Sequence, residues 1–497
     1  MRNLFRALLK ADGDGIFGQA MSAGFWAAAL RIILRFSMII RTVILARILA
    51  PEDFGLMAIA TLAIALLERF TQSGFESALV QQTDDIEPYL NTAWTLQIVR
   101  ALSMAGVLVL AAPLIASFFN APEAVRILQV MAVAVAIKGF QNIAVVTFIK
   151  ELQFDKYFIL QIASRGTDII VSIAAALILG NVWALVIGVV SGSIVRLIVS
   201  YAIHSYRPRI RWVWSQVKQL FNFGKWILLN QILGYASGNL DDILVGRLLG
   251  VQALGFYRMA FNFSQAVATE VTQVTNQVAF PTYSKLQNAA GKLRNAYMGT
   301  VHLVAFLGFP IAIGTVLVAP DLTYGILGDK WAPIIVPMQL LSVSGLVRGI
   351  SATAGPLFQS QGRPDIPPRY TFAKVMMMAI FLYPAINAFG ISGAALVIVL
   401  SGLITGTSAL WLAFSFVKAK RSQLKQALLF PALNTALMSL AVVTTKLAFF
   451  HDETIVSFLV LVVTGGVTYL GAVFLSTRFI GYAAPSDLLK RVRGAMA

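Results

Sequence analysis

Runs of about 20 apolar residues recur along the whole length of this 497-residue chain, and each is long enough to cross a lipid bilayer as a helix. The chain is 58% hydrophobic and only 12% charged, with a mean hydropathy of +0.78. A soluble domain carries roughly 25% charged residues, so this sequence has too little polar surface to cover a soluble globule. Because backbone polar groups must be satisfied internally in lipid, these runs predict membrane-spanning helices.

Fourteen apolar segments can be delimited in the sequence, and the second is the most polar of them. The predicted spans are 22–48, 55–80, 89–117, 124–149, 157–179, 183–204, 222–249, 255–280, 296–318, 332–358, 367–388, 392–416, 426–449 and 454–478. The first run is too long for a signal-peptide core, so we expect it to be retained. The expected fold class is an all-α integral membrane protein with about 14 transmembrane helices.

Lysine and arginine gather in alternate loops between the predicted spans. One set of loops and termini holds basic residues within 2–10, 150–156, 207–218, 285–294, 363–369, 418–425 and 490–493. The opposite set has little beyond Lys330. The positive-inside rule therefore predicts that both termini of this multi-pass protein are cytoplasmic. The net charge of +17 then reflects membrane topology, and we expect no nucleic-acid partner.

A basic, tryptophan-containing connector follows the sixth span. Residues 205–219 include RPRIRWVWSQVKQ, in which cations alternate with Trp212 and Trp214. Such a segment is expected to lie along the lipid headgroups, with its indoles at the interface. The predicted divisions of the chain are an N-lobe at 1–204, this basic linker at 205–221, a C-lobe at 222–416, and helices 13–14 with a basic tail at 417–497.

Two stretches 200 positions apart share a similar pattern of apolar residues, with identical residues at three of 15 aligned positions. VILARILAPEDFGLM at 43–57 aligns with ILVGRLLGVQALGFY at 243–257, which places Arg47 over Arg247. Six predicted spans separate the copies, an even number, so both copies point the same way. This pattern predicts two six-helix lobes in parallel repeat about an axis along the membrane normal. A cleft between two such lobes is the expected place for a substrate.

Several motifs resemble those of a known transporter family. They are LARILAPEDFG at 45–55, FGKW at 223–226, LDDILVGRLLGVQALGFYRMA at 240–260, QVAFPTYSKLQ at 277–287, LGDKW at 327–331 and QLLSVSGLVRG at 339–349. The chain resembles the polysaccharide-transporter branch of the multidrug/oligosaccharidyl-lipid/polysaccharide exporter superfamily, which includes Wzx-like and colanic-acid-exporter-like lipopolysaccharide flippases.

That resemblance implies a function. Such proteins move undecaprenyl-pyrophosphate-linked oligosaccharides from the cytoplasmic to the periplasmic leaflet of the bacterial inner membrane. Alternating access between the lobes, coupled to an ion gradient, is the implied mechanism. The implied partners are the lipid-linked oligosaccharide, membrane lipids, and a polysaccharide polymerase with other proteins of the surface-polysaccharide pathway.

Cations outnumber acids within the predicted spans. A charge at bilayer depth costs about 2.5–3.5 kcal/mol on insertion scales, so it usually faces a cavity or a partner. Arginine forks match phosphate oxygens, and moving a lipid pyrophosphate needs a cationic path. The predicted contacts for the pyrophosphate and glycan are Arg31, Arg35, Arg41, Arg100 and Arg348. Lys138, Arg196 and Lys374 are weaker candidates for the same role.

The alternative for each of these cations is local pairing with a carboxylate. Arg165 and Asp168, three residues apart on one helical face, are expected to pair with each other. Glu68 is an alternative partner for the arginines of the first span. Arg47 and Arg247 fall at helix ends, where snorkelling to the headgroups explains them without a substrate.

Four acidic residues are candidates for ion coupling, because a carboxylate in a low-dielectric site can carry a proton. They are Glu68, Asp241, Asp242 and Glu270. A salt bridge to a neighbouring arginine is an equally good interpretation of each. The sequence does not distinguish proton from sodium.

Motifs for catalysis or for bound cofactors are missing from the sequence. There is no cysteine, the three histidines lie far apart, and no GxxxxGK[ST] motif occurs. We therefore expect no enzyme activity, no metal site and no cofactor. A drug or metabolite exporter of the same superfamily is one alternative, although cationic drugs favour an acidic cavity. A membrane polymerase or ligase is the other, but the largest predicted periplasmic loop, around 319–331, is short.

Overall fold

A computed structural model describes residues 16–71, 87–151, 153–479 and 481–482. All regular structure in this part of the chain is helical, and no strand occurs within it. The chain forms two compact units, Met1–Ile232 and Leu233–Ala497, and the division falls within helix α10 (Trp214–Leu249). The predicted linker at 205–221 ends 11 residues before this division, and residues 483–497 of the basic tail lie outside the described residues.

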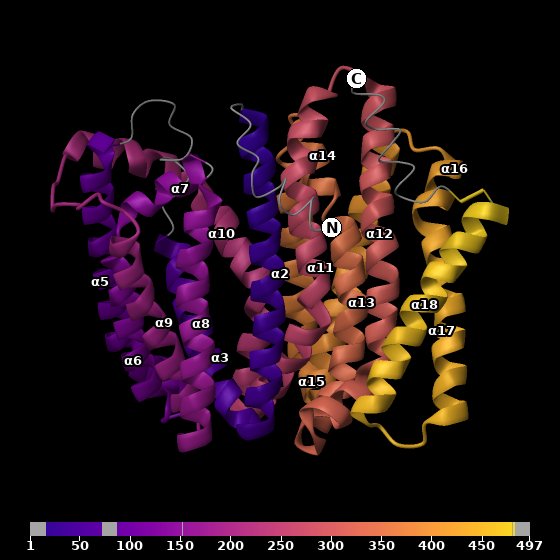
Figure 1. Ribbon diagram of the computed structural model, residues 1–497, viewed down its shortest axis with the longest axis horizontal. Coiled ribbons are helices and arrows are strands. Elements are labelled where there is room, and N and C mark those ends of the chain that lie inside the picture. The colour runs from indigo at the N-terminus through magenta and orange to yellow at the C-terminus, as the bar shows by residue number, and fades with distance from the viewer. Residues whose placement is uncertain (1–15, 72–86, 152, 480, 483–497) are drawn as a thin grey trace. The chain divides into compact units, whose positions relative to one another are not determined.

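The first unit is a bundle of antiparallel helices (Figure 1). Its elements before α10 are α2 (Ile16–Ile48), α3 (Pro51–Thr71), α5 (Glu87–Phe118), α6 (Ala124–Gly139), η1 (Ile143–Val145), α7 (Val146–Lys150), α8 (Phe154–Leu179) and α9 (Trp183–Ala202). Helix α8 packs along α9 and α2, and α6 packs along α5 and α9. A continuous series of contacts thus joins α2 to α5 through α8, α9 and α6.

The second unit contains the longer helices. Its elements after α10 are α11 (Val251–Lys285), α12 (Ala290–Asp321), η2 (Leu322–Leu327), η3 (Asp329–Ile334), α13 (Ile335–Ser351), α14 (Ala354–Ser360), α15 (Ile366–Phe416), α16 (Arg421–Leu424), η4 (Lys425–Leu429), α17 (Phe430–Phe449) and α18 (Ile455–Phe479). Helix α13 packs against α11, α12 and α15, so it is central to this unit.

Helix α15 is two predicted spans joined at a kink. Gly390 has φ 59° and ψ −139°, a conformation that glycine adopts at no steric cost. It lies between the predicted spans 367–388 and 392–416. The 51 residues of α15 therefore hold two helical segments, as the hydropathy pattern indicated.

The outer surface of the helices is apolar, which reverses the pattern of a soluble protein. Leu110 on α5 is 80% exposed and Ile178 on α8 is 82% exposed. Exposed apolar surface on this scale has no counterpart on soluble monomers, and lipid is its natural solvent. The prediction of an all-α membrane protein is confirmed.

The number of spans agrees with the sequence without being fixed by it. Within the described ranges, nine helical segments are long and apolar enough to cross a bilayer, or ten if α6 and the η1–α7 segment, bent by 71°, form one span. Every one of the fourteen predicted ranges overlaps a helix. The end of the second range, after Thr71, lies outside the described residues. The count of fourteen stays a prediction.

The duplicated sequence has the same structure in both copies. Helix α2 ends at Ile48 and α3 begins at Pro51, while α10 ends at Leu249 and α11 begins at Val251. Arg47 and Arg247 occupy the last turns of α2 and α10, and both are exposed. Their positions favour the snorkelling interpretation over substrate binding.

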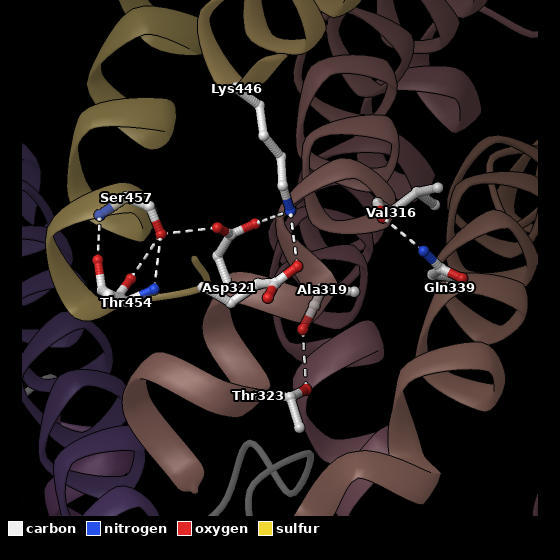
Figure 2. A network of polar contacts seen from close by, with 9 residues as sticks. Val316, Ala319, Asp321, Thr323, Gln339, Lys446, Thr454 and Ser457 are labelled. Atoms are coloured by element: carbon white, nitrogen blue, oxygen red, sulfur yellow. Dashed lines mark hydrogen bonds and ion pairs between the residues drawn. The ribbon is translucent and has the colours of Figure 1, made fainter. Parts of the chain in front are cut away.

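Polar contacts attach the last two helices to α12. Asp321, which is fully buried, accepts Lys446 Nζ of α17 at 2.7 Å and Ser457 Oγ of α18 at 2.7 Å (Figure 2). Thr454 and Ser457 also bond to each other across the first turn of α18. Gly325 of η2 lies so close to the Thr454 backbone that an added Cβ would approach within 2.5 Å of the carbonyl carbon. Shape and charge together thus fix α17 and α18 against α12.

Candidate functional site

The first unit encloses a cavity of about 700 Å³ between α3, α5, α6, α8 and α9. Five cations line it, namely Arg69, Arg100, Lys138, Arg165 and Arg196. Glu68 and Asp168 are the two carboxylates in the same lining. Neutral hydrogen-bonding groups come from Gln97, Gln141, Gln161, Ser164 and Ser193. Five cations and two carboxylates give the described lining a net charge of +3. The outer face of the helices around the cavity is apolar.

The cavity lies in one half of the bundle. The start of α5 and the end of α9 lie at the same end of the bundle, because the amide of Arg209, in the segment after α9, donates to Asn91 near the start of α5. Positions in the bundle are measured from this end. At 1.5 Å per residue, Arg100 lies about 20 Å along α5 from Glu87 and Arg165 about 16 Å along α8 from Phe154. Both are nearer to that end than to the opposite one. The positive-inside rule predicts that this end is cytoplasmic.

Arg100 and Glu68 are brought together at one wall of the cavity. Arg100 donates from Nε to Thr71 Oγ1 at 3.0 Å and from Nη2 to the carbonyl oxygen of Glu68 at 3.4 Å. The Glu68 carboxylate lies 4.0 Å from Lys138 Nζ, and both side chains are half-exposed. A half-exposed pair at this distance is weak, so both groups remain available to a ligand.

Amide side chains orient Arg196 in the cavity lining. Arg196 donates from Nε to Gln141 Oε1 at 3.0 Å and from Nη1 to Gln161 Oε1 at 2.9 Å. Both acceptors are uncharged, so these two bonds fix the guanidinium without cancelling its charge. Gln97 donates to the carbonyl oxygen of Gly139 at 3.0 Å, which satisfies a backbone acceptor at the end of α6.

Asp168 pairs with Arg41 rather than with its neighbour on the same helix. Arg41 Nη2 lies 2.9 Å from Asp168 Oδ1, and Arg41 Nε donates to Ser172 Oγ at 3.0 Å. The predicted Arg165–Asp168 ion pair does not form, because Asp168 pairs with Arg41 instead, although Arg165 and Asp168 both line the cavity. From the sequence alone, only partners three or four residues away on the same helix could be proposed for Asp168. Its actual partner, Arg41, is 127 positions away.

Two glycines of α9 allow α8 to hold Asp168 in this position. A Cβ added at Gly188 would lie 2.7 Å from Ser172 Cβ and 2.8 Å from Asp168 Oδ1. A Cβ added at Gly192 would lie 2.9 Å from the carbonyl oxygen of Ser164. Small residues let membrane helices approach closely. Here the close approach of α9 to α8 also packs α9 directly against Asp168, the partner of Arg41.

The remaining predicted residues of the first span are only partly described. Arg35 is half-buried, and its Nε has no hydrogen-bond partner among the described residues. The side chain of Arg31 lies outside the described residues. The assignment of both to the substrate path stays a prediction. Arg41 is not in the described cavity lining, but it forms an ion pair with Asp168, which is.

The acidic candidates of the second unit are adjacent on α10. Asp241 accepts Tyr257 Oη at 2.7 Å, and Asp242 pairs with Arg258 Nη1 at 2.8 Å. Both aspartates are buried, and one oxygen of each, Oδ1, has no hydrogen-bond partner among the described residues. Arg258 was missed in the sequence, because only the turn between α10 and α11 brings a residue 16 positions away beside Asp242.

Arg348 lines a separate, smaller pocket within the second unit. This pocket of about 220 Å³ also contains Lys374, whose Nζ lies 3.4 Å from the carbonyl oxygen of Ser237. Arg348 is also 6.0 Å from the ring centroid of Phe261, within cation–π range. The side chain of Glu270 lies outside the described residues. The described residues contain no group of three metal-ligating side chains.

Comparison with known families relates this chain to proteins of polysaccharide biosynthesis. The model of a family described as polysaccharide biosynthesis protein matches residues 44–336. The lipopolysaccharide biosynthesis protein WzxC of Escherichia coli (strain K12) is 24% identical over 367 residues, which is 72% of this chain and 73% of WzxC. The teichuronic acid biosynthesis protein TuaB of Bacillus subtilis (strain 168) is 23% identical over 435 residues, 87% of this chain and 90% of TuaB.

Two solved structures share the fold. The lipid II flippase MurJ in an inward closed conformation aligns with a TM-score of 0.71 and 14% identity, over 91% of this chain and 99% of MurJ. An inward-facing multidrug resistance MATE family transporter of the MOP superfamily aligns with a TM-score of 0.60 and 16% identity, over 78% of this chain and 98% of that transporter. At these identities the likeness concerns the helical fold alone.

Proposed function

Because this chain belongs to the polysaccharide biosynthesis protein family, whose model spans more than half of it, we propose that it is a flippase for lipid-linked oligosaccharides in surface-polysaccharide biosynthesis. It is a Wzx-like polysaccharide transporter of the multidrug/oligosaccharidyl-lipid/polysaccharide exporter superfamily. The substrate proposed for it is an undecaprenyl-pyrophosphate-linked repeat unit.

The cationic cavity of the first unit is the observation that carries this proposal. A lipid pyrophosphate concentrates negative charge that hydrocarbon cannot solvate, so its passage needs a polar, positively charged surface. Arg100, Arg165 and Arg196 present guanidinium groups at that surface, and guanidinium forks suit phosphate oxygens. The amides of Gln141 and Gln161 provide the kind of hydrogen-bonding groups that sugar hydroxyls use.

The same charge argues against the main alternative. In this cavity, five cations would repel a cationic drug. Only two carboxylates in the lining could attract it, and one of them, Asp168, is already paired with Arg41. Membrane polymerase or ligase activity lacks support, since the segment between α12 and α13 folds into short helical turns and leaves no large loop there.

The orientation and the mechanism are proposed together. We place both termini in the cytoplasm and the protein in the bacterial inner membrane, so the cavity lies in the cytoplasmic half of the first unit, where substrate is loaded. Alternating access between the lobes then exposes the pyrophosphate to the periplasmic side. Asp241 and Asp242 are the best-supported candidates for coupling to an ion gradient, because each is buried with one unpartnered oxygen among the described residues.

A binding experiment tests the cavity directly. Purified protein in nanodiscs is titrated with undecaprenyl pyrophosphate and, separately, with undecaprenol, which has the same tail without phosphate. Arg100→Gln, Arg165→Gln and Arg196→Gln are each expected to weaken pyrophosphate binding by about tenfold or more, the usual effect of losing a hydrogen bond to a charged group. Arg47→Gln, at an exposed helix end, is the control and should bind like the parent protein.

Two outcomes of that titration would contradict the proposal. One is equal affinity for undecaprenol and for undecaprenyl pyrophosphate. The other is unchanged pyrophosphate affinity in all three cavity variants, each shown to be folded by its thermal unfolding curve.

A further inference from the structure

The segment that leaves α9 is held against the first unit by its own backbone. We name residues 206–214 the strap. Within it, the amide of Arg209 donates to Asn91 Oδ1 at 2.7 Å, and the amide of Arg211 donates to Thr95 Oγ1 at 2.9 Å. Asn142 Nδ2 donates to the carbonyl oxygen of Tyr206 at 2.8 Å. The strap is therefore a positioned element of the bundle rather than a free connector.

The spacing of these bonds gives the strap two faces. Amides two residues apart bond to acceptors one turn apart on α5, which is the pattern of an extended segment. Side chains of an extended segment alternate, so the arginines at 207, 209 and 211 are separated from Ile210 and Trp212. All three arginines are exposed, and within the described chain neither Arg209 nor Arg211 forms an ion pair.

The apolar side chains of the strap are also exposed. Ile210 is 79% exposed and Trp214 is 69% exposed, and Trp212 stacks on Trp214 with ring centroids 6.3 Å apart. A stacked indole pair beside an exposed isoleucine is costly in water. At the boundary between hydrocarbon and headgroups, indoles are favourable because one end is apolar and the other can hydrogen-bond.

The length of α9 places the strap at that boundary. Helix α9 has 20 residues, which at 1.5 Å per residue span about 30 Å, the thickness of the hydrocarbon core. The strap begins four residues after α9 ends at Ala202. It therefore emerges at headgroup level, where its apolar side chains meet the acyl boundary and its arginines meet lipid phosphates.

We propose that the strap is a binding site for anionic phospholipid headgroups. Ile210, Trp212 and Trp214 insert into the interfacial layer, and Arg207, Arg209 and Arg211 contact the phosphates. Anionic lipid fits better than an acidic protein, because a protein partner would have to cover the indoles as well as the charges. The proposal rests on the orientation given above but not on the transported substrate, so either can fail alone.

The absence of cysteine makes a single-label experiment clean. Ile210→Cys is labelled with an environment-sensitive fluorophore, and the protein is placed in nanodiscs of phosphatidylcholine with or without phosphatidylglycerol. In the presence of phosphatidylglycerol the emission should shift to the blue, lipids with a doxyl group near the headgroup should quench it, and iodide should not. High salt should reverse the effect of phosphatidylglycerol, because it screens exposed charges.

Charge variants test the arginines. Replacing Arg207, Arg209 and Arg211 by Gln should lower the ratio of lipid-docked to exposed label about fivefold for each residue changed. The matched control is a label at Ser422→Cys together with Lys418→Gln, Lys420→Gln and Arg421→Gln, a second basic loop of equal charge. That label should stay accessible to iodide in both lipids, with or without those charges.

Each result decides the question. Docking that depends on phosphatidylglycerol and on the strap arginines supports the proposal. The proposal is overturned if the label at 210 is open to iodide in both lipids, or if the triple glutamine variant docks as well as the parent.

Discussion

Arg41 on α2 donates from Nη2 to Asp168 Oδ1 on α8 at 2.9 Å, and this contact ties the first helix of the chain to the α8–α9 hairpin. Only 14% of the Arg41 side chain and 6% of the Asp168 side chain are exposed, so the pair is largely shielded from solvent. Asp168 lines the cavity and Arg41 holds it there. Arg41 is therefore a positioning residue for Asp168.

Arg41→Gln is expected to destabilise the protein by about 3–5 kcal/mol, because it leaves a buried carboxylate without its ionic partner. Arg165→Gln is the matched control, since Arg165 faces the cavity three residues from Asp168 and should cost about 0.5 kcal/mol or less. Thermal unfolding in one detergent compares the two variants. Equal losses of stability in the two variants would mean that Asp168 depends on Arg165 as much as on Arg41 for its charge partner.

Gly188→Ala is expected to cost about 1–3 kcal/mol, because the new methyl group would overlap Ser172 and the Asp168 carboxylate and push α9 away from α8. Gly166→Ala on α8 is the control, since no heavy atom lies within 4 Å of its added Cβ. That control should be neutral or more stable by up to about 1 kcal/mol. A harmless Gly188→Ala would show that the close contact is not needed.

The sequence was sufficient to predict the membrane class, the helical segments and the duplicated helix ends, because all of these depend on local composition. Apolar length defined the helices, and the division of α15 agrees with the predicted break between the spans 367–388 and 392–416, where Gly390 lies. Partners across the bundle could not be predicted. The Arg41–Asp168 pair and the Arg258–Asp242 pair depend on which helices are neighbours, and no local spacing encodes that.

The sequence predicted a cationic substrate path and placed it in a cleft between the lobes, which stays a prediction, whereas the cavity found lies within the first unit. Arg100 and Glu68 were chosen for their depth within apolar runs, and they do line it. Arg196 was ranked low because it lies near a helix end, and Arg69 was not considered a ligand. The amides of Gln141 and Gln161 were missed because neutral side chains give no charge signal in an apolar run. These two amides orient the Arg196 guanidinium, a contact that can be seen only once the fold is known.

Asp321→Asn is expected to loosen α17 and α18, because the new amide cannot accept both Lys446 and Ser457 as a carboxylate does. Losing the charge-assisted bond to Lys446 should cost about 1.5–3 kcal/mol. Hydrogen exchange is the measurement: amides in the first turn of α18 should exchange faster, while those of α8 and α9 stay unchanged as an internal control. Unchanged exchange in α18 would show that apolar packing alone holds the pair.

Protonation of His204 is expected to release the start of the strap. Nδ1 accepts the amide of Tyr206 at 3.0 Å, so Nε2 carries the proton and donates to Thr147 Oγ1 at 3.2 Å. Burial, and then the Lys156 cation, lower the pKa of His204; Glu151 opposes this and Arg207 adds to it. The folded pKa therefore lies below the unfolded value of about 6.5.

The sign of the pH effect follows from that order. As pH falls through about 6.5, the unfolded state gains a proton that the folded state resists, so the stability contributed by neutral His204 is lost toward acid pH. The protection of the Tyr206 amide, its exchange rate compared with the intrinsic rate at the same pH, should fall below that pH in the parent protein. In His204→Gln, which cannot titrate, the exchange should lose this pH step. A step that persists in the variant would assign it to another group.

The central claim is that this protein carries a lipid-linked oligosaccharide across the membrane, and leaflet position is its most direct measurement. In a strain lacking the protein, the undecaprenyl-linked repeat unit is labelled by a membrane-impermeant reagent in intact spheroplasts and again in inverted vesicles. The account predicts that the unit accumulates at the cytoplasmic face and that one surface polysaccharide disappears. The parent gene should restore both, and a folded Arg100→Gln, Arg196→Gln double variant should not. A repeat unit that still reaches the periplasmic face in the deletion strain would contradict the account.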